Sequence, residues 1–212
     1  MAAFTIKQTV LRNILANAIT QNTRIIDIAH ELANDKLEIE KAKMINDFED
    51  HKYSMEIKAG PKAENSSNSL GGYGNLFSFI GFVEGSNPIG NVTNILREYT
   101  FLKKSSRGAR YLKNSVKYEF EVYFPAKEEL RAETPFPWGT GDSWLFGIET
   151  YISGVNYYLY SRSKKFKTSR SGPAIQVETD LRLGKFERPP FFIPAGDYIS
   201  KILENFKKKF KK

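Results

Sequence analysis

Apolar residues near the start of the chain recur every three or four positions, which is the spacing of one face of an α-helix. The stripe lies within residues 4–51 and begins with Ile6, Val10, Leu11, Ile14, Leu15, Ala18 and Ile19. The pattern breaks at residues 21–23. Thr23 is suited to cap a second helix there, because its hydroxyl can accept a hydrogen bond from a free first-turn amide.

The second expected helix follows Thr23 and is long and amphipathic. Its apolar residues are Ile25, Ile26, Ile28, Ala29, Leu32, Ala33, Leu37, Ile39, Ala42, Met44, Ile45 and Phe48, and its charged residues are Glu31, Asp35, Lys36, Glu38, Glu40, Lys41 and Lys43. Such a helix needs a partner surface, because most helical stability comes from packing of the apolar face. Two alternatives stay open: the helix packs on a sheet of its own chain, or part of it docks on a neighbouring subunit.

A glycine cluster separates this helical portion from the rest of the chain. Gly71, Gly72 and Gly74 permit backbone angles that other residues avoid, and we interpret them as a structural hinge. Residues 76–82 follow as a short apolar run that predicts a buried strand, with Phe77 and Phe79 on one face. The expected division is therefore a helical arm and linker at residues 1–68 and a body at residues 69–212.

The middle of the chain changes from helical to alternating patterns. We expect a turn at residues 84–88, a short helix from residue 92 whose end overlaps a possible strand at 100–102, and a basic polar loop at 105–110. Residues 116–124 are the clearest strand. One face is apolar, and the other is polar. The apolar face comprises Val116, Tyr118, Phe120, Val122 and Phe124.

The last third predicts a helical turn at residues 126–133, then strands at 144–148, 155–160 and 174–177, a loop at 164–171 and an extended piece at 188–194. A final helix opens at residues 195–197, with an apolar stripe of Tyr198, Ile199, Ile202, Leu203 and Phe206. Helices and strands are segregated along the chain, which favours an α+β fold. We expect long N-terminal helices and a C-terminal helix packed on a mostly antiparallel β-sheet.

Composition limits the classes of function. The chain has 212 residues, 41% hydrophobic and 26% charged, which suits one domain with an appendage. It contains no cysteine, so disulfides and thiolate metal sites are excluded, as fits a reducing compartment. No apolar run approaches the ~20 residues of a membrane span, and residues 1–13 do not match a signal peptide. We expect no membrane insertion.

Catalytic and metal-binding patterns are missing. The two histidines, His30 and His51, stand apart and favour a surface or interface role. The glycine cluster is not a phosphate-binding loop, because Asn75 and the apolar run follow it in place of a lysine and a helix. Asp142, held in a glycine-rich turn, is interpreted as a turn-capping side chain. The sequence therefore predicts no enzyme and no cofactor.

The net charge of +8 is partly clustered. One basic segment lacks acids, and another ends the chain. Their residues are Arg162, Lys164, Lys165, Lys167 and Arg170 in the first, and Lys207, Lys208, Lys209, Lys211 and Lys212 in the second. Such cations can neutralise DNA phosphates without reading sequence. Contact with an acidic protein or an anionic membrane surface, and a merely solvated loop and tail, stay open.

Three features together resemble the neck or tail-completion structural proteins (head–tail connectors) of tailed bacteriophages. They are the long N-terminal helical arm, residues 65–82 with Gly74-Asn75-Leu76-Phe77, and residues 137–160 with Pro137-Trp138-Gly139-Thr140-Gly141-Asp142-Ser143-Trp144, followed by Ser169-Arg170-Ser171-Gly172. The motifs are structural, and the resemblance carries over no catalytic residue.

The resemblance implies a homo-oligomeric ring, sixfold or twelvefold, between the portal end of the capsid and the tail. It further implies contact with portal, neck or tail proteins, with DNA passing through, and location in the virion and in the host cytoplasm during assembly. The alternative is a non-sequence-specific nucleic-acid-binding protein that uses residues 162–170 and the lysine tail. An enzyme with an unrecognised site ranks last.

Overall fold

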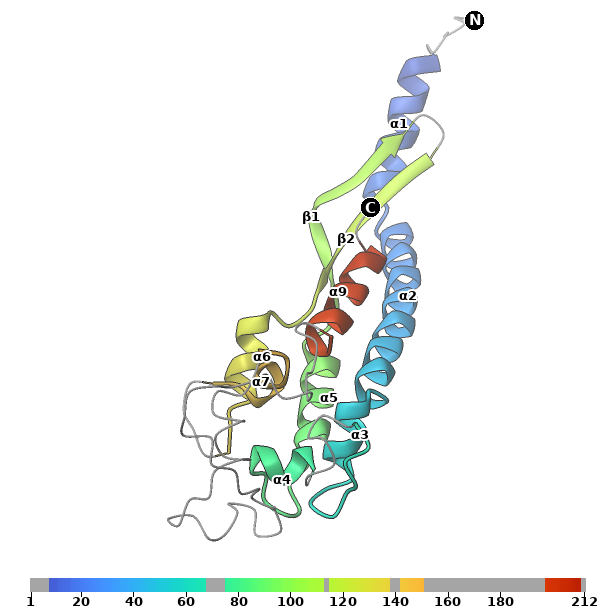
Figure 1. Ribbon diagram of the computed structural model, residues 1–212. Coiled ribbons are helices and arrows are strands. Elements are labelled where there is room, and N and C mark those ends of the chain that lie inside the picture. The colour runs from blue at the N-terminus through green and yellow to red at the C-terminus, as the bar shows by residue number, and fades with distance from the viewer. Residues whose placement is uncertain (1–7, 68–74, 113–114, 138–141, 151–196, 211–212) are drawn as a thin grey trace, which may run out of the picture. The chain divides into compact units, whose positions relative to one another are not determined.

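The computed structural model describes residues 8–67, 75–112, 115–137, 142–150 and 197–210. The chain forms two compact units. Unit 1 comprises Met1–Lys41 and Tyr99–Phe124, and unit 2 comprises Ala42–Glu98 and Pro125–Lys212. The elements are labelled in Figure 1. The division into an arm of residues 1–68 and a body of residues 69–212 stays a prediction. The hinge glycines Gly71, Gly72 and Gly74 lie outside the described residues.

Unit 1 combines helices with a β-hairpin. Helix α1 spans Gln8–Gln21, and helix α2 spans Thr23–Glu49 and continues into unit 2. Strands β1 (Phe101–Leu112) and β2 (Ser115–Tyr123) pair antiparallel, and α1 packs beside both (Figure 1). The Tyr118 hydroxyl donates a hydrogen bond to the Ile19 carbonyl over 3.1 Å, which attaches β2 to the end of α1.

The junction between α1 and α2 differs in one detail from the expectation. The side-chain oxygen of Asn22, not that of Thr23, accepts a hydrogen bond from the Ile25 amide over 3.3 Å. Asparagine is among the strongest helix-capping residues, and its amide oxygen reaches the third residue beyond it. The predicted break between the helices is confirmed, and the capping residue is Asn22, one position before the predicted Thr23.

The hairpin confirms the strand predicted at 116–124, with Val116, Tyr118 and Phe120 half-buried and Lys117 exposed. The basic loop predicted at 105–110 is wrong, because these residues belong to β1. The pairing nevertheless shifts register between Lys104 and Ala109, where β1 carries additional residues opposite β2. The polar residues that predicted a loop therefore lie where the pairing of the two strands is irregular.

Unit 2 is a helical core. It contains α3 (Lys52–Lys58), α4 (Leu76–Ile80), α5 (Pro88–Glu98), α6 (Lys127–Glu133), α7 (Trp144–Thr150) and α9 (Ile199–Phe210). Helix α3 packs on α4 and α5, α5 on α6, and α7 on α9. Its largest fully buried side chains include Phe48, Phe77, Leu145 and Tyr198.

The strand predicted at 76–82 is wrong, because this run forms helix α4. Asn75 takes an extended conformation, and its side chain accepts a hydrogen bond from the Ser78 amide over 2.9 Å. Gly81, at φ 91°, ends the helix in the left-handed conformation. The Phe82 amide then bonds to the Phe77 carbonyl over 3.2 Å, and the two rings lie 5.4 Å apart. Both caps are characteristic of helix ends, and they outweigh the strand propensity of the aromatic residues.

The strand predicted at 144–148 is also wrong, because these residues lie in α7. The Ser143 hydroxyl accepts a hydrogen bond from the Phe146 amide over 3.4 Å, as a helix-capping side chain does. Trp144, Leu145, Phe146 and Ile148 are all buried in the helical core, so this short helix shows no alternation of apolar and solvent-exposed positions. Periodicity alone cannot separate such a helix from a buried strand.

The α+β class and the antiparallel pairing are confirmed, although helices dominate and the sheet has two strands in the part of the chain that the structure describes. The helical turn predicted at 126–133 is α6, and the final helix is α9, whose predicted stripe is buried. The strands predicted at 155–160 and 174–177, the loop at 164–171 and the extended piece at 188–194 lie outside the described residues.

Candidate functional site

The basic residues at the end of α9 are the predicted contact residues that the structure describes. Lys207, Lys208 and Lys209 form its last turn and are exposed. The Lys208 ammonium lies 2.9 Å from the carboxylate of Glu204, one turn earlier on the same exposed surface. Arg162, Lys164, Lys165, Lys167 and Arg170 lie outside the described residues. A cationic surface at the end of α9 is therefore the candidate site for a polyanion.

Aromatic side chains anchor the other face of α9. Tyr198 is fully buried, stacks on Phe48 with ring centroids 5.7 Å apart, and shares a 2.7 Å hydrogen bond between its hydroxyl and that of Ser54. Burial raises the pKa of the Tyr198 phenol. Tyr53 packs edge-on against Tyr198, and burial raises its pKa to about 12. The tyrosines thus stay neutral and hold the start of α9.

A buried carboxylate completes this anchor. Glu149, at the end of α7, is 2% exposed. Its Oε1 accepts hydrogen bonds from the backbone amides of Tyr198 (3.2 Å) and Ser200 (2.8 Å), and its Oε2 accepts one from the Ser200 hydroxyl (2.6 Å). A negative charge satisfies the free first-turn amides of a helix and favours the helix dipole. Glu149 therefore fixes where α9 begins.

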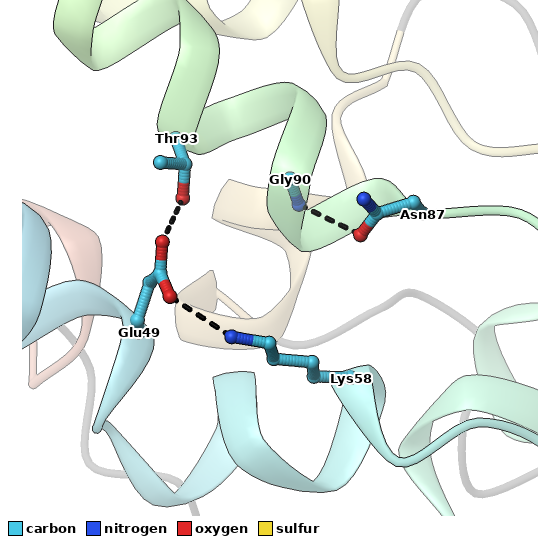
Figure 2. Close-up of polar contacts among 5 residues, drawn as sticks. All are labelled: Glu49, Lys58, Asn87, Gly90 and Thr93. Atoms are coloured by element: carbon cyan, nitrogen blue, oxygen red, sulfur yellow. Dashed lines mark hydrogen bonds and ion pairs between the residues drawn. The ribbon is translucent and has the colours of Figure 1, made fainter.

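A second cluster joins the end of α2 to α3 and α5 (Figure 2). The Glu49 carboxylate accepts hydrogen bonds from the Lys58 ammonium over 2.9 Å and from the Thr93 hydroxyl over 3.0 Å. These bonds hold the pKa of Glu49 below its ordinary value of 4.5. Asn87 caps α5 nearby, because its side-chain oxygen accepts a hydrogen bond from the Gly90 amide over 3.0 Å.

An open cleft of about 490 Å³ lies beside the start of α9. It is lined by Asp47, Asp50, His51, Lys52, Asp197, Tyr198, Lys201, Ile202 and Asn205. It holds both acidic and basic groups, and one pair of them interacts: the Asp197 carboxylate binds the Lys201 ammonium, which lowers the pKa of Asp197. The cleft thus presents mixed charge rather than a single-sign binding surface.

His51 has a structural role in this cleft. Its Nδ1 accepts a hydrogen bond from the Tyr53 amide over 3.4 Å, so it caps α3. Its ring lies 4.7 Å from that of Tyr198, and burial lowers its pKa below the ordinary value of 6.5. Within the described ranges, no group of three or more His, Cys, Asp or Glu side chains is placed to hold a metal ion. Neither of the other two candidate residues belongs to such a group. His30 packs edge-on against Phe120, and the Asp142 side chain is exposed.

Sequence reasoning found the lysines of α9 and missed the carboxylates that hold the fold around them. Glu149 follows an apolar run with nothing in its neighbours to mark it, and its partners lie about fifty residues away. None of the described helices has the length and apolar character to cross a membrane. Comparison with known protein families, curated proteins and solved structures finds no match for this chain.

Proposed function

We propose that the protein is a structural virion protein of a tailed bacteriophage that forms an oligomeric ring at the head–tail junction, as a neck, tail-completion or tail-terminator protein. The ring, sixfold or twelvefold, contacts portal, neck or tail proteins and encloses a passage for DNA. Its location is the virion, and the host cytoplasm during assembly. The resemblance of residues 65–82 and 137–160 to that family supports the virion role, and the exposed surface of unit 1 supports assembly.

One observation carries the assembly part of the proposal. Among the side chains that the structure describes in unit 1, only Ala16, Leu37 and Thr100 are buried. Large apolar side chains of the same unit are exposed: Leu15, Ile25, Ile28, Leu32, Ile39, Tyr99, Phe101 and Tyr123. A two-stranded hairpin is marginal by itself, and exposed large apolar side chains that gather on one surface are typical of a protein interface.

The test is the state of the protein in particles and in solution. We expect mass spectrometry of purified virions to detect the chain, and electron microscopy of the particles to place it in a ring at the head–tail junction. A protein that is absent from virions and strictly monomeric at micromolar concentration would refute the proposal.

A second candidate function is non-sequence-specific nucleic-acid binding, favoured by the exposed Lys207, Lys208 and Lys209. Binding to duplex DNA should then fall steeply with salt. Replacing these three lysines by alanine should make the slope of log K against log salt shallower by about 0.9 for each lost phosphate contact. The same comparison applies to Lys164, Lys165 and Lys167.

The matched control removes the same charge elsewhere. Lys62, Lys103 and Lys117 are exposed and lie outside both basic segments. Their replacement by alanine should leave the salt slope unchanged. Equal effects of the two triple variants would show that only net charge matters and would remove the basic segments as a binding site.

A further inference from the structure

Helix α2 carries two apolar faces. One faces the protein: Leu37 is fully buried, and the His30 ring packs edge-on against Phe120 with centroids 5.4 Å apart. The other carries Ile25, Ile28, Leu32 and Ile39, which are 37%, 50%, 66% and 58% exposed. We call these four residues the outward face of α2. An apolar stripe of this length on one helix is the form in which helices bind other helices.

The outward face follows a heptad repeat. Ile25, Leu32 and Ile39 recur at intervals of seven residues, and Ile28 lies three residues after Ile25. These spacings assign Ile25, Leu32 and Ile39 to position a of a coiled coil and Ile28 to position d, which together form the seam between helices. Leu37 takes position f, opposite the seam, in agreement with its burial on the other side. The repeat predicts that the occupant of this face is itself a helix.

The charges beside the seam identify that helix. Glu31 and Glu38 occupy position g, and Lys36 and Lys43 occupy position e. In a parallel pair, position g of one helix meets position e of the following heptad in the other, so Glu31 meets Lys36 and Glu38 meets Lys43 of the second copy. In an antiparallel pair, g meets g and e meets e, which would bring like charges together.

We propose that the outward face of α2 binds the same face of a second copy of this chain in a parallel, in-register coiled coil. The inference deepens the proposed function, because it rests on self-assembly and names the surface and orientation. Because both copies use the same face, the contact is isologous and pairs subunits about a twofold axis, so a ring of six or twelve copies needs a further, heterologous contact between the pairs.

Asp35 limits the strength of this contact. It is exposed and occupies the second d position, between Leu32 and Ile39. Two copies would bring their Asp35 carboxylates together at the seam, and a polar residue there sets register at a cost in affinity. Asp35→Leu should therefore tighten self-association about tenfold or more.

The first experiment measures the oligomeric state of the full-length protein by sedimentation velocity between about 1 and 100 μM, a range suited to moderate affinities. Leu32→Asp should weaken self-association by about a hundredfold or more, because it puts a charge in the seam. The matched control is Val83→Asp, since Val83 is 69% exposed and lies off α2. Circular dichroism of both variants should match the native protein. Equal weakening by both variants would overturn the proposal.

Charge reversal tests the pairing. Glu31→Lys alone and Lys36→Glu alone should each weaken self-association about tenfold, because each turns an attraction into a repulsion at both symmetric contacts. The double variant Glu31→Lys/Lys36→Glu should restore it. Glu84→Lys, at an exposed position off α2, should have no effect. A double variant as weak as the single variants would refute the parallel pairing.

Introduced cysteines test the orientation, because the native chain has none. Ile25→Cys and Ile39→Cys lie about 21 Å apart along the helix. In a parallel, in-register pair each variant should form a disulfide-linked dimer with itself, since identical positions face each other within the reach of a disulfide. An antiparallel pair would hold identical positions near the two ends of the helix far apart, so neither variant would link to itself, and that result would overturn the orientation.

These outcomes separate the inference from the proposed function. If the native protein assembles and Leu32→Asp assembles equally well, the outward face of α2 is not the contact, and the virion role stands. If the free protein is monomeric but virions contain it in a ring, the coiled coil is again refuted alone. Absence from virions refutes the virion role, even where the cysteine variants cross-link as expected.

Discussion

Glu56 provides the sharpest test of how unit 2 is held together. It lies in α3, is 1% exposed, and its two carboxylate oxygens accept hydrogen bonds from separate backbone amides. One comes from Ser67 over 2.9 Å, and the other from Leu76 over 2.7 Å. The carboxylate thus attaches both ends of the segment between these residues to the core. A buried amide that loses its acceptor costs free energy, because no water replaces the bond.

Glu56→Gln is the informative substitution, since it keeps the shape of the side chain and changes one acceptor oxygen into a donor. The remaining oxygen can serve one amide, and the new NH2 group faces the other. Loss of one charge-assisted hydrogen bond and an unsatisfied buried amide should lower the free energy of unfolding by about 2–3 kcal/mol. With a urea dependence of about 2 kcal/mol per M, the unfolding midpoint should fall by about 1–1.5 M.

The assay is urea unfolding followed by tryptophan fluorescence. Trp144 is buried in unit 2, where its ring lies 5.3 Å from that of Phe82, so its emission reports on this core. The control is Glu64→Gln, at an exposed glutamate in the same region, which should leave the midpoint unchanged. Hydrogen exchange should also show faster exchange at Ser67 or Leu76 in the Glu56 variant. A midpoint within about 0.25 M of the native value, with unchanged slope, would refute this account of Glu56.

The remaining predictions concern helix caps and pH. Gly81→Ala should destabilise unit 2 by about 1 kcal/mol in urea unfolding, because Gly81 is left-handed with φ 91°; an unchanged midpoint would show that the cap relaxes. Gly90→Ala should lower the free energy of unfolding, since the added Cβ would lie 2.7 Å from Cγ of the capping Asn87. In an Asn87→Ala background the same substitution should raise the free energy of unfolding by about 1 kcal/mol, because alanine favours a helix over glycine. A change of the same sign in both backgrounds would contradict the clash. The folded-state pKa of His51 is lowered, so its contribution to the free energy of unfolding should be fully present above pH 6.5 and be lost as the pH falls through the folded pKa. His51→Asn keeps a capping oxygen and should remove this pH dependence of the unfolding midpoint in urea titrations. The pKa of Glu49 is lowered from 4.5, so its contribution should be present above pH 4.5 and be lost as pH falls below it, and Glu49→Gln should flatten the stability profile in that acidic range.

The sequence predicted elements well where one face of the element meets solvent. The strand at 116–124 alternates, and α9 carries its stripe at helical spacing, so periodicity identified both. Fully buried short elements lack that contrast. For α4, the decisive signals were the capping residues Asn75 and Gly81 at its two ends, and these favoured a helix over the strand that its aromatic residues predicted.

The carboxylates that organise unit 2 could not be found in the same way. Glu56 bonds to amides 11 and 20 residues away, and Glu149 bonds to groups 49 and 51 residues away. Their partners are backbone amides, which nearly every residue possesses, so no pattern of side chains in the sequence predicts the contact. By contrast, the exposed lysines of α9 form a run that is visible in the sequence alone.

The low burial of unit 1 connects folding with assembly. Few of its described side chains are buried, and a two-stranded hairpin is at best marginally stable by itself. In the proposed coiled coil, a second copy would cover the four exposed side chains of the outward face of α2, and binding to the folded form would stabilise it by mass action. Asp35 then has a physical role: it lowers the affinity of each contact, so that subunits remain separable until several contacts form together. On this proposal, the apolar residues of the outward face of α2 would drive binding, and the charge of Asp35 within that face would keep the binding reversible.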